Sequence, residues 1–149
     1  MFKVNKLLNN VKYDLRKLST QNLSVPEITV TRRITQEDLN SFSSLCGDSN
    51  IIHSEDIPEE ERYVHGAFLN SLISGIMGSK IPGPGSIVVS QKFKFPRKCR
   101  INQDIELNVK LIDNRKIMKT VYHIKQANNI VFQGEASLIR LSSLSKNQQ

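Results

Sequence analysis

One short stretch of the sequence carries three side chains that can take part in proton chemistry. Asp48, Asn50 and His53 lie within six residues of one another, just after a helix-like segment. A carboxyl group with an ordinary pKa of about 4 and an imidazole with one of about 6.5 suit paired acid–base catalysis around neutral pH. The same pattern also suits a turn in which Asp48 and Asn50 accept hydrogen bonds from backbone NH groups. Both interpretations stay open at this point.

This stretch does not predict a metal site. If Asp48 were the first position of a calcium-binding loop, the sixth position, which must be glycine, would be His53. One histidine and one carboxylate are too few for zinc, and neither His65 nor His123 completes a recognisable ligand set. We therefore predict no metal and no cofactor.

The elements that position these residues follow from the pattern of side chains around them. β-Branched residues from 27 to 33 predict a strand, and Thr35 with Asp38 three residues later predicts the start of a helix that ends near Cys46. Polar residues from 48 to 64 predict a loop that holds one short helical turn. Loops often carry functional sites.

A second helix is predicted from Ala67 to Ser79. It is apolar on most sides, and its small or polar residues fall on one narrow strip, namely Asn70, Ser71, Ser74, Gly75 and Gly78. We therefore expect this helix to be buried. Its apolar run falls short of the roughly 20 residues that cross a bilayer, so we expect no membrane span.

Strand-like segments with turn signals between them follow a break at Ile81-Pro-Gly-Pro-Gly85. Four strands in sequence predict an antiparallel sheet, and one helix against such a sheet is an α+β fold. Alternating apolar residues predict three faces that pack inward: Ile87, Val89, Phe93 and Phe95; Ile105, Leu107, Val109 and Leu111; and Phe132, Gly134, Ala136 and Leu138.

Two further motifs extend the pattern around Asp48. Residues 64–66 read Val-His-Gly at the start of the second predicted helix, and residues 81–86 read Ile-Pro-Gly-Pro-Gly-Ser. In order and spacing, the three stretches resemble the MaoC-like (R)-specific enoyl thioester hydratases and dehydratases, in which a Gly-Asp-x-Asn-Pro-x-His loop precedes a Val-His-Gly helix start and a Leu-Pro-Gly-x-Gly-Ser turn. The resemblance runs from Ile34 to Leu141. It implies a hot-dog fold for residues 25–141, with a long central helix wrapped by a curved antiparallel sheet, and a homodimer.

Two departures from the family pattern concern the entrance of the pocket. The proline that follows the family's asparagine is Ile51 here, and the small residue usual after the histidine is replaced around Pro58 and Glu59. The link from His53 to the second helix also looks short. These departures bear on the choice of substrate more than on the acid–histidine pair.

The resemblance implies a role for each residue of the predicted site. Asp48 and His53 form the acid–base pair, and the backbone NH of Gly66 stabilises the thioester oxygen with the positive end of a helix dipole behind it. Asn50 holds the loop or the reacting water. Ser74 lines the pocket or assists the oxyanion site, with close packing as the alternative.

Four other residues that can do chemistry are given no catalytic role. We interpret His65, at the helix start, as structural, and His123 as solvent-exposed on the polar side of its strand. Cys46 and Cys99 have neither CxxC nor zinc spacing, so we expect two small buried residues in a reducing compartment.

The implied activity is dehydration of (R)-3-hydroxyacyl thioesters to trans-2-enoyl thioesters, reversible as hydration. A hot-dog acyl thioesterase is an alternative, although such enzymes typically place their acid on or beside the central helix, where this chain has Asn70, Ser71 and Ser74. The isoelectric point of about 9.6 raises an RNA-binding module as a third class. The sequence has no RNP-type aromatic motif and no KH loop, so we expect no nucleic-acid partner.

Much of the net charge of +7 comes from the first 24 residues. This segment holds five basic residues against the single acid Asp14, and its apolar residues recur at helix-like spacing, as in mitochondrial transit peptides. A basic amphipathic helix that stays on the protein is the alternative. We therefore expect a matrix enzyme of mitochondrial fatty acid synthesis, with an (R)-specific enoyl-CoA hydratase as the runner-up. Residues 142–149 form a polar tail.

A second basic cluster, Arg97, Lys98 and Arg100, follows Phe95 and Pro96. An acyl carrier protein is acidic, so a basic rim around the pocket would attract and hold it. The alternative is that these residues are ordinary solvated charges. The expected partner is therefore an acyl carrier protein or a CoA thioester.

Overall fold

The computed structural model describes residues 25–141, so the predicted targeting segment, residues 1–24, and the polar tail, residues 142–149, lie outside the described part. The elements in chain order are β1 (Glu27–Arg33), α1 (Gln36–Cys46), short 3₁₀ turns at Ile51–His53 and Glu59–Glu61, α2 (Gly66–Ser79), β2 (Ser86–Lys94), β3 (Asp104–Asn114), β4 (Met118–Gln126) and β5 (Asn129–Arg140). Each predicted helix and strand is present. The predicted loop holds two helical turns rather than one.

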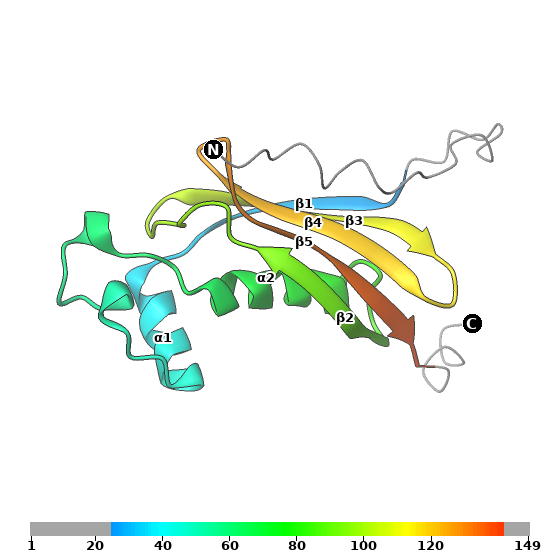
Figure 1. The fold of residues 1–149 in the computed structure, drawn as a ribbon, viewed down its shortest axis with the longest axis horizontal. Coiled ribbons are helices and arrows are strands. Elements are labelled where there is room, and N and C mark those ends of the chain that lie inside the picture. The colour runs from blue at the N-terminus through cyan, green and yellow to red at the C-terminus, as the bar shows by residue number, and fades with distance from the viewer. Residues whose placement is uncertain (1–24, 142–149) are drawn as a thin grey trace, which may run out of the picture.

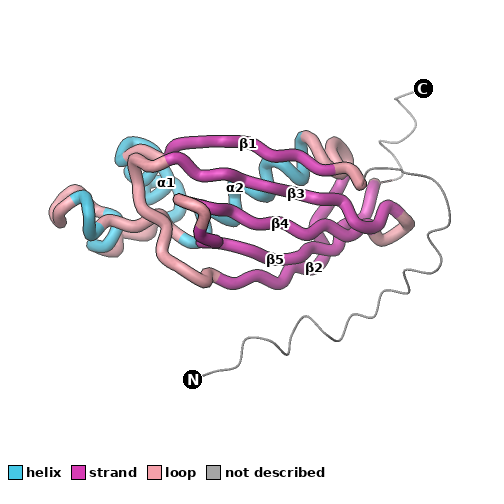
Figure 2. The backbone as a smooth tube through the Cα atoms, turned by 90° about the horizontal axis from the view of Figure 1, so that it is seen from above, coloured by secondary structure: helices cyan, strands magenta, loops and turns pink. Residues whose placement is uncertain are grey.

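The strands form one antiparallel sheet with the order β1-β3-β4-β5-β2 (Figure 2). The long helix α2 lies against one face of this sheet, whereas α1 and the loops that follow it lie beyond one end (Figure 1). The predicted α+β architecture is confirmed. No helix in the described residues is long and apolar enough to cross a membrane.

The core lies between α2 and the inner face of the sheet. The predicted inward residues of β3 are all buried, and those of β5 are buried except for Gly134, which is half-buried. Burial of such side chains stabilises the fold by about 1.5–3 kcal/mol each. The alternation of apolar and polar residues in β3 and β5 therefore predicted the correct face of each strand.

The prediction for β2 was wrong, because a β-bulge interrupts the strand between Val88 and Ser90. Ile87 pairs with Ile139 and Phe93 pairs with Gly134, and these partners on β5 are an odd number of residues apart. Ile87 and Phe93 therefore lie on opposite faces of the sheet. β2 is also an edge strand, so its apolar residues stay exposed: Ile87 43%, Val88 36%, Val89 53% and Phe93 47%.

The ends of α1 follow from its sequence as predicted. The Thr35 hydroxyl accepts a hydrogen bond from the backbone NH of Asp38, and the Asp38 carboxylate accepts one from the backbone NH of Thr35. The helix ends at Gly47, whose φ of 78° is the left-handed conformation that glycine adopts most readily. Because α1 lies at the end of the sheet, it buries only Leu39 fully.

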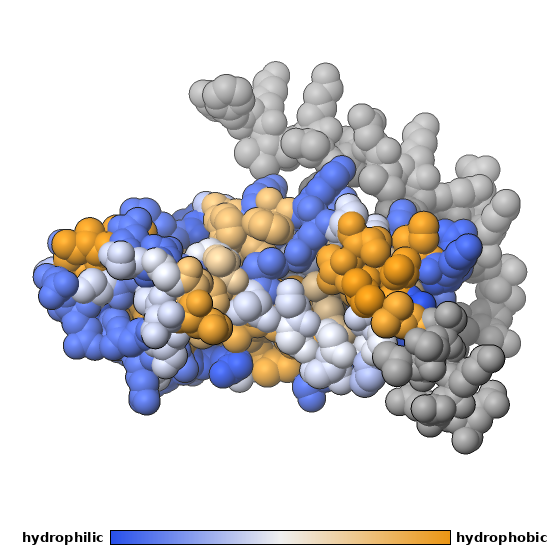
Figure 3. Space-filling view, turned by 90° about the horizontal axis from the view of Figure 1, so that it is seen from below, coloured by the Kyte–Doolittle hydropathy of each residue, from blue (hydrophilic) through white to orange (hydrophobic). Residues whose placement is uncertain are grey.

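The helix α2 is buried on one side only, which corrects the prediction of a buried helix. Leu69, Ile73, Ile76 and Met77 face the sheet. On the other side, Ser71, Ser74, Gly75 and Gly78 of the predicted strip are exposed and Asn70 is half-buried. A single sheet covers only one face of a helix, and Figure 3 views the face left open.

Two of the residues without a catalytic role also differ from expectation. Cys99 is buried, and this burial raises the pKa of its thiol to about 12, but Cys46 is exposed because it ends a helix that barely enters the core. His123 is half-buried on the outer face of the sheet rather than solvent-exposed, and burial lowers its pKa.

Candidate active site

The loop from Asp48 to His53 is held by its own polar side chains. The Asp48 carboxylate accepts a hydrogen bond from the backbone NH of Asn50 (3.1 Å), and the Asn50 side chain accepts one from the NH of Ile52 (3.3 Å). Asn50 thereby starts the 3₁₀ turn that ends at His53. The turn interpretation of these residues is thus correct, and it leaves one oxygen of Asp48 for other contacts.

His53 is the buried member of the pair, with 7% of its surface exposed. Its Nδ1 lies 2.6 Å from the Tyr63 carbonyl oxygen, which can only accept, so Nδ1 carries a proton. The Gln36 side chain donates to the His53 carbonyl (3.0 Å), which ties the turn to α1. In the neutral imidazole, Nε2 is therefore unprotonated and can act as a base.

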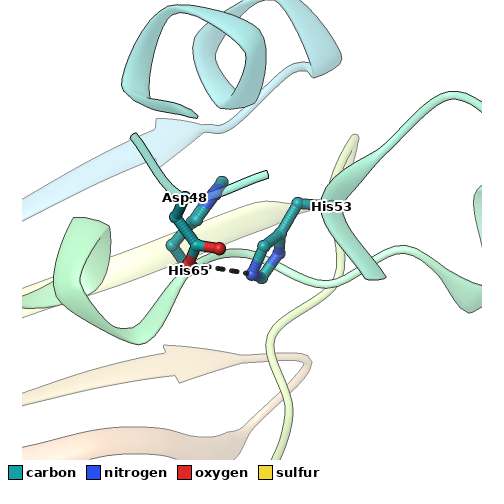
Figure 4. Close-up of side chains that lie close together, drawn as sticks. All are labelled: Asp48, His53 and His65. Carbon is teal, nitrogen blue, oxygen red and sulfur yellow. Dashed lines mark ion pairs between the residues drawn. The ribbon is translucent and has the colours of Figure 1, made fainter. Parts of the chain in front are cut away.

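The free nitrogen of His53 faces Asp48. His53 Nε2 lies 3.8 Å from Asp48 Oδ2, and the Asp48 side chain is 46% exposed (Figure 4). This distance exceeds that of a direct hydrogen bond, so a single oxygen atom can contact both groups at hydrogen-bonding distance. The two residues that the sequence paired are thus brought together around a position for a reacting oxygen.

Gly66 supplies a backbone donor to the same region. It is the first residue of α2, and the first helical hydrogen bond of α2 runs from the Leu69 NH to the His65 carbonyl (3.2 Å). The NH groups of Gly66, Ala67 and Phe68 therefore have no partner within the helix. A β-carbon on residue 66 would lie 2.8 Å from the Phe95 ring, so this close approach requires glycine.

A pocket of about 530 Å³ connects His53 with Gly66, and Asp48 lies outside its lining. Its lining combines His53 and Gly66 with apolar and basic residues: Ile52, Tyr63, Val64, Leu69, Phe95, Pro96, Arg97, Lys98 and Cys99. The segment that carries the basic residues is fixed to the start of α2, because the Val64 NH donates to the Cys99 carbonyl (2.8 Å).

The predicted basic rim separates into two parts. Arg97 and Lys98 line the pocket and are exposed. The Arg100 side chain instead donates to the Glu60 carbonyl and lies over the Tyr63 ring, as Lys98 also does at 4.5 Å. Arg100 therefore holds the rim in place, and the charges at the mouth come from Arg97 and Lys98.

Like Asp48, the predicted site residues Asn50 and Ser74 lie outside the pocket lining. Asn50 is exposed and acts in the turn, which agrees with a residue that holds the loop. Ser74 is exposed on the open side of α2, two turns beyond Gly66, and does not line the pocket of the described chain.

Several residues at the site were not predicted from the sequence. His65 lies against His53, Tyr63 holds His53 through its carbonyl, and Phe95 closes over Gly66. The contact from Tyr63 uses its backbone carbonyl, which every residue has, so the residue type could not indicate it. For His65, only its place in the Val-His-Gly motif could have pointed to the site.

One possible ligand atom each from Asp48, His53 and His65 lies within 4.8 Å of the other two, so these residues are close enough to be considered as a metal site. The two imidazole rings are stacked at 3.5 Å with only 23° between their planes, so their nitrogen lone pairs run side by side. His53 Nδ1 is also occupied by the Tyr63 carbonyl. Metal ligands must converge on one point, and these rings do not.

The site places a carboxylate 3.8 Å from an imidazole, beside a pocket that also contains a helix N-terminus, an arrangement suited to acid–base chemistry. Comparison with known proteins makes the class more specific. The chain is 30% identical over 132 residues to a 3-hydroxybutyryl-CoA dehydratase of Methylorubrum extorquens, covering 83% of this chain and 84% of the relative. It is 29% identical over 119 residues to an (R)-specific enoyl-CoA hydratase of Rhodospirillum rubrum, covering 74% and 83%.

Solved structures agree on the fold. The (R)-hydratase of A. caviae superimposes with a TM-score of 0.72 at 24% identity, covering 82% of this chain and all of that one. A MaoC-like dehydratase from Rhodospirillum rubrum superimposes with a TM-score of 0.61 at 12% identity, covering 78% and 92%. No family model matches the chain. The fold is the hot-dog fold, as predicted, and the chain belongs to the MaoC-like hydratases and dehydratases and is a hydro-lyase.

Proposed function

We propose that the chain interconverts (R)-3-hydroxyacyl thioesters and trans-2-enoyl thioesters. One observation carries the proposal: Asp48 and His53 face one position for an oxygen atom, and the pocket that His53 lines also contains the N-terminal residue of α2, Gly66. The names of the relatives, a 3-hydroxybutyryl-CoA dehydratase and an (R)-specific enoyl-CoA hydratase, support this reaction.

The proposed hydration starts with water between Asp48 and His53. The water gives a proton to the pair as its oxygen forms the bond to C3 of the enoyl group. Negative charge develops on the thioester oxygen, where the Gly66 NH and the positive end of α2 stabilise it. The pair then returns a proton to C2, so no proton is gained or lost overall. Dehydration runs through the same steps in reverse.

A hot-dog thioesterase is the competing function, because fold alone does not decide the chemistry. The test uses a trans-2-enoyl-CoA and the purified chain, and follows the enoyl absorbance and free thiol in the same sample. We expect the absorbance to fall without thiol release, and the product to be the (R)-3-hydroxyacyl thioester. Release of one thiol for each substrate consumed would contradict the proposal.

For the physiological substrate, we propose an acyl carrier protein thioester in mitochondrial fatty acid synthesis. Arg97 and Lys98 at the pocket mouth support an acidic partner. The (R)-specific enoyl-CoA hydratase reaction is the second candidate, favoured by the CoA substrates in the relatives' names. Both substrates carry a phosphate at the end of the pantetheine arm, so both can use the two basic residues.

Charge reversal at the mouth separates these candidates. Replacing Arg97 and Lys98 by Glu should raise KM strongly for a carrier-protein substrate, less for CoA, and hardly at all for a short pantetheine thioester. Lys125→Glu, on the outer face of the sheet, is the matched control and should leave every KM unchanged. Equal increases for all three substrates would show that the rim acts on the pocket itself.

Mitochondrial localisation is part of the same proposal and is supported by the composition of residues 1–24. A chain that begins at residue 25 should hydrate at the full rate in vitro and should fail to reach the matrix in cells. Unchanged localisation of the shortened chain would contradict the targeting role.

We also propose that the enzyme is a homodimer. β2 is an edge strand that pairs only with β5 within the described chain, and it carries exposed apolar residues. The open side of α2 lies on the same side of the sheet as the exposed Phe93. A second copy pairing along β2 would cover the exposed edge of β2.

A further inference from the structure

His65 is a buried imidazole that the proposed reaction does not use. It directly precedes α2, is 2% exposed, and occupies the N-cap position of the helix. In the described chain its side chain makes no capping hydrogen bond to α2. Contacts other than helix capping must therefore hold the His65 ring in its position.

Those contacts join three elements around the site. His65 Nε2 lies 3.0 Å from the Ser43 hydroxyl on α1, and the Phe42 ring packs against the imidazole with 5.1 Å between centroids. On its other side, the imidazole stacks on His53 at 3.5 Å. The residue after it is Gly66, the proposed oxyanion donor. His65 thus links α1, the turn of His53 and the start of α2.

The second ring nitrogen is unusual. His65 Nδ1 is closed off from solvent and makes no hydrogen bond to any described residue, although most buried polar atoms in proteins are paired. A hydrophobic side chain would fill such a place without leaving a polar atom unpaired. Because Nδ1 is closed off from solvent and Nε2 is bonded to Ser43, we assign His65 no proton transfer in the reaction.

We propose that His65 is a positioning residue, a neutral imidazole anchored by Ser43 that holds the plane of the His53 ring and its spacing from Asp48. The inference rests on the proposed reaction at Asp48 and His53. A ring stacked at 3.5 Å permits His53 only a narrow range of orientations. Misplacement of a reacting group by about 1 Å can cost roughly 10²-fold in rate, so this constraint matters for turnover.

The charge state of His65 agrees with this role. Burial lowers the pKa of His65, and the neighbouring His53 lowers it further, so the His65 ring stays neutral while His53 takes up and releases a proton. The titratable groups that face His65 are Asp48 from the loop and His53 from the turn, whereas α1 contributes the uncharged Ser43 and Phe42.

The test compares variants that remove either the ring or its anchor. His65→Leu removes the stacking ring, and Ser43→Ala removes only the hydrogen bond to Nε2. We expect His65→Leu to lower kcat by roughly 10-fold to 100-fold with little change in KM, and Ser43→Ala to lower it by less. Both should shift the acidic limb of the pH profile of kcat/KM, because the position of His53 changes.

Thr35→Ala is the matched control, since it weakens α1 at its N-cap without touching His65. It should lower the melting temperature and leave kcat and the pH profile unchanged. If His65→Leu and Ser43→Ala behave like Thr35→Ala, His65 is purely structural and the inference fails.

A readout without substrate separates this failure from failure of the proposed function. The chain has three histidines, so the His53 imidazole can be followed by NMR titration. We expect its titration to shift in Ser43→Ala and in His65→Leu, whatever the reaction is. An unshifted His53 titration in both folded variants would overturn the positioning role, whereas a wild-type chain that does not hydrate would overturn only the proposed function.

Discussion

At the scale of single residues, the side chains of Asp48 and His53 hold the loop in place and keep one atom each for the proposed chemistry. One oxygen of Asp48 accepts a backbone NH while the other faces His53, and His53 uses one nitrogen for the Tyr63 carbonyl and keeps the other free. The backbone contacts thereby fix the directions of the groups that we propose to react. A structural role in the turn and the proposed catalytic role are therefore compatible at these residues.

The two cysteines provide a prediction that depends on burial alone. A cysteine thiolate attacks a disulfide reagent and displaces one of its sulfurs, so the exposed Cys46 should be modified rapidly at pH 8. The buried Cys99, whose pKa is raised to about 12, should stay unmodified until the chain unfolds. Counting the thiols modified with time measures this. Cys46→Ser should abolish the rapid phase, and two equally rapid thiols in the wild type would show that the region around Cys99 opens.

The sequence indicated the residues whose type and spacing are themselves the signal. Asp48, His53 and Gly66 were found in this way, and the structure brings them to one region. The roles of His65 and Ser43 depend on which elements pack together, and nothing in their spacing of 22 residues indicates contact. Ser74 was assigned to the site from the family resemblance, and in the described chain it does not line the pocket.

At the scale of elements, most of the fold could be predicted because local patterns determine it. The capping pair at Thr35 and Asp38 marked the start of α1, and period-two alternation marked β3 and β5. The prediction of the inward-facing residues of β2 failed because one extra residue in a bulge reverses the alternation of faces. Nothing in the sequence indicates where that extra residue lies. An edge strand also has no second neighbour to bury its side chains.

The contact between β2 and β5 provides a test of packing at one glycine. A β-carbon at residue 134 would collide with the Lys92 carbonyl and lie 2.6 Å from the Tyr122 hydroxyl. Because the Lys92 carbonyl is backbone and cannot move aside, Gly134→Ala should lower the free energy of unfolding by about 2 kcal/mol, measured by denaturant titration. Ser137→Ala on the same strand is the control, expected within about 0.5 kcal/mol of the wild type. If Gly134→Ala were as stable as the wild type, β2 and β5 would be less tightly packed at residue 134 than the structure shows.

At the scale of the whole molecule, the single chain leaves both its β2 edge and one side of α2 uncovered. We expect the wild type to sediment at twice the mass of the chain. Val89→Lys places a charge on the exposed edge and should give monomers, because lysine blocks edge-to-edge pairing. Leu45→Lys, at an exposed apolar residue on α1, should stay dimeric. A wild type that sediments as a monomer at high concentration would contradict the dimer.

The central claim is that Asp48 and His53 carry out the proton transfers of hydration. The direct measurement is the turnover of purified Asp48→Asn, which keeps the size of the side chain and its hydrogen bond to the Asn50 NH but removes the charge. We predict a loss in kcat of about 10² or more with an unchanged melting temperature, and a loss in kcat of the same size for folded His53→Ala. Asp56→Asn, an exposed acid in the following loop, should retain full activity. Near-normal turnover in folded Asp48→Asn would contradict the account.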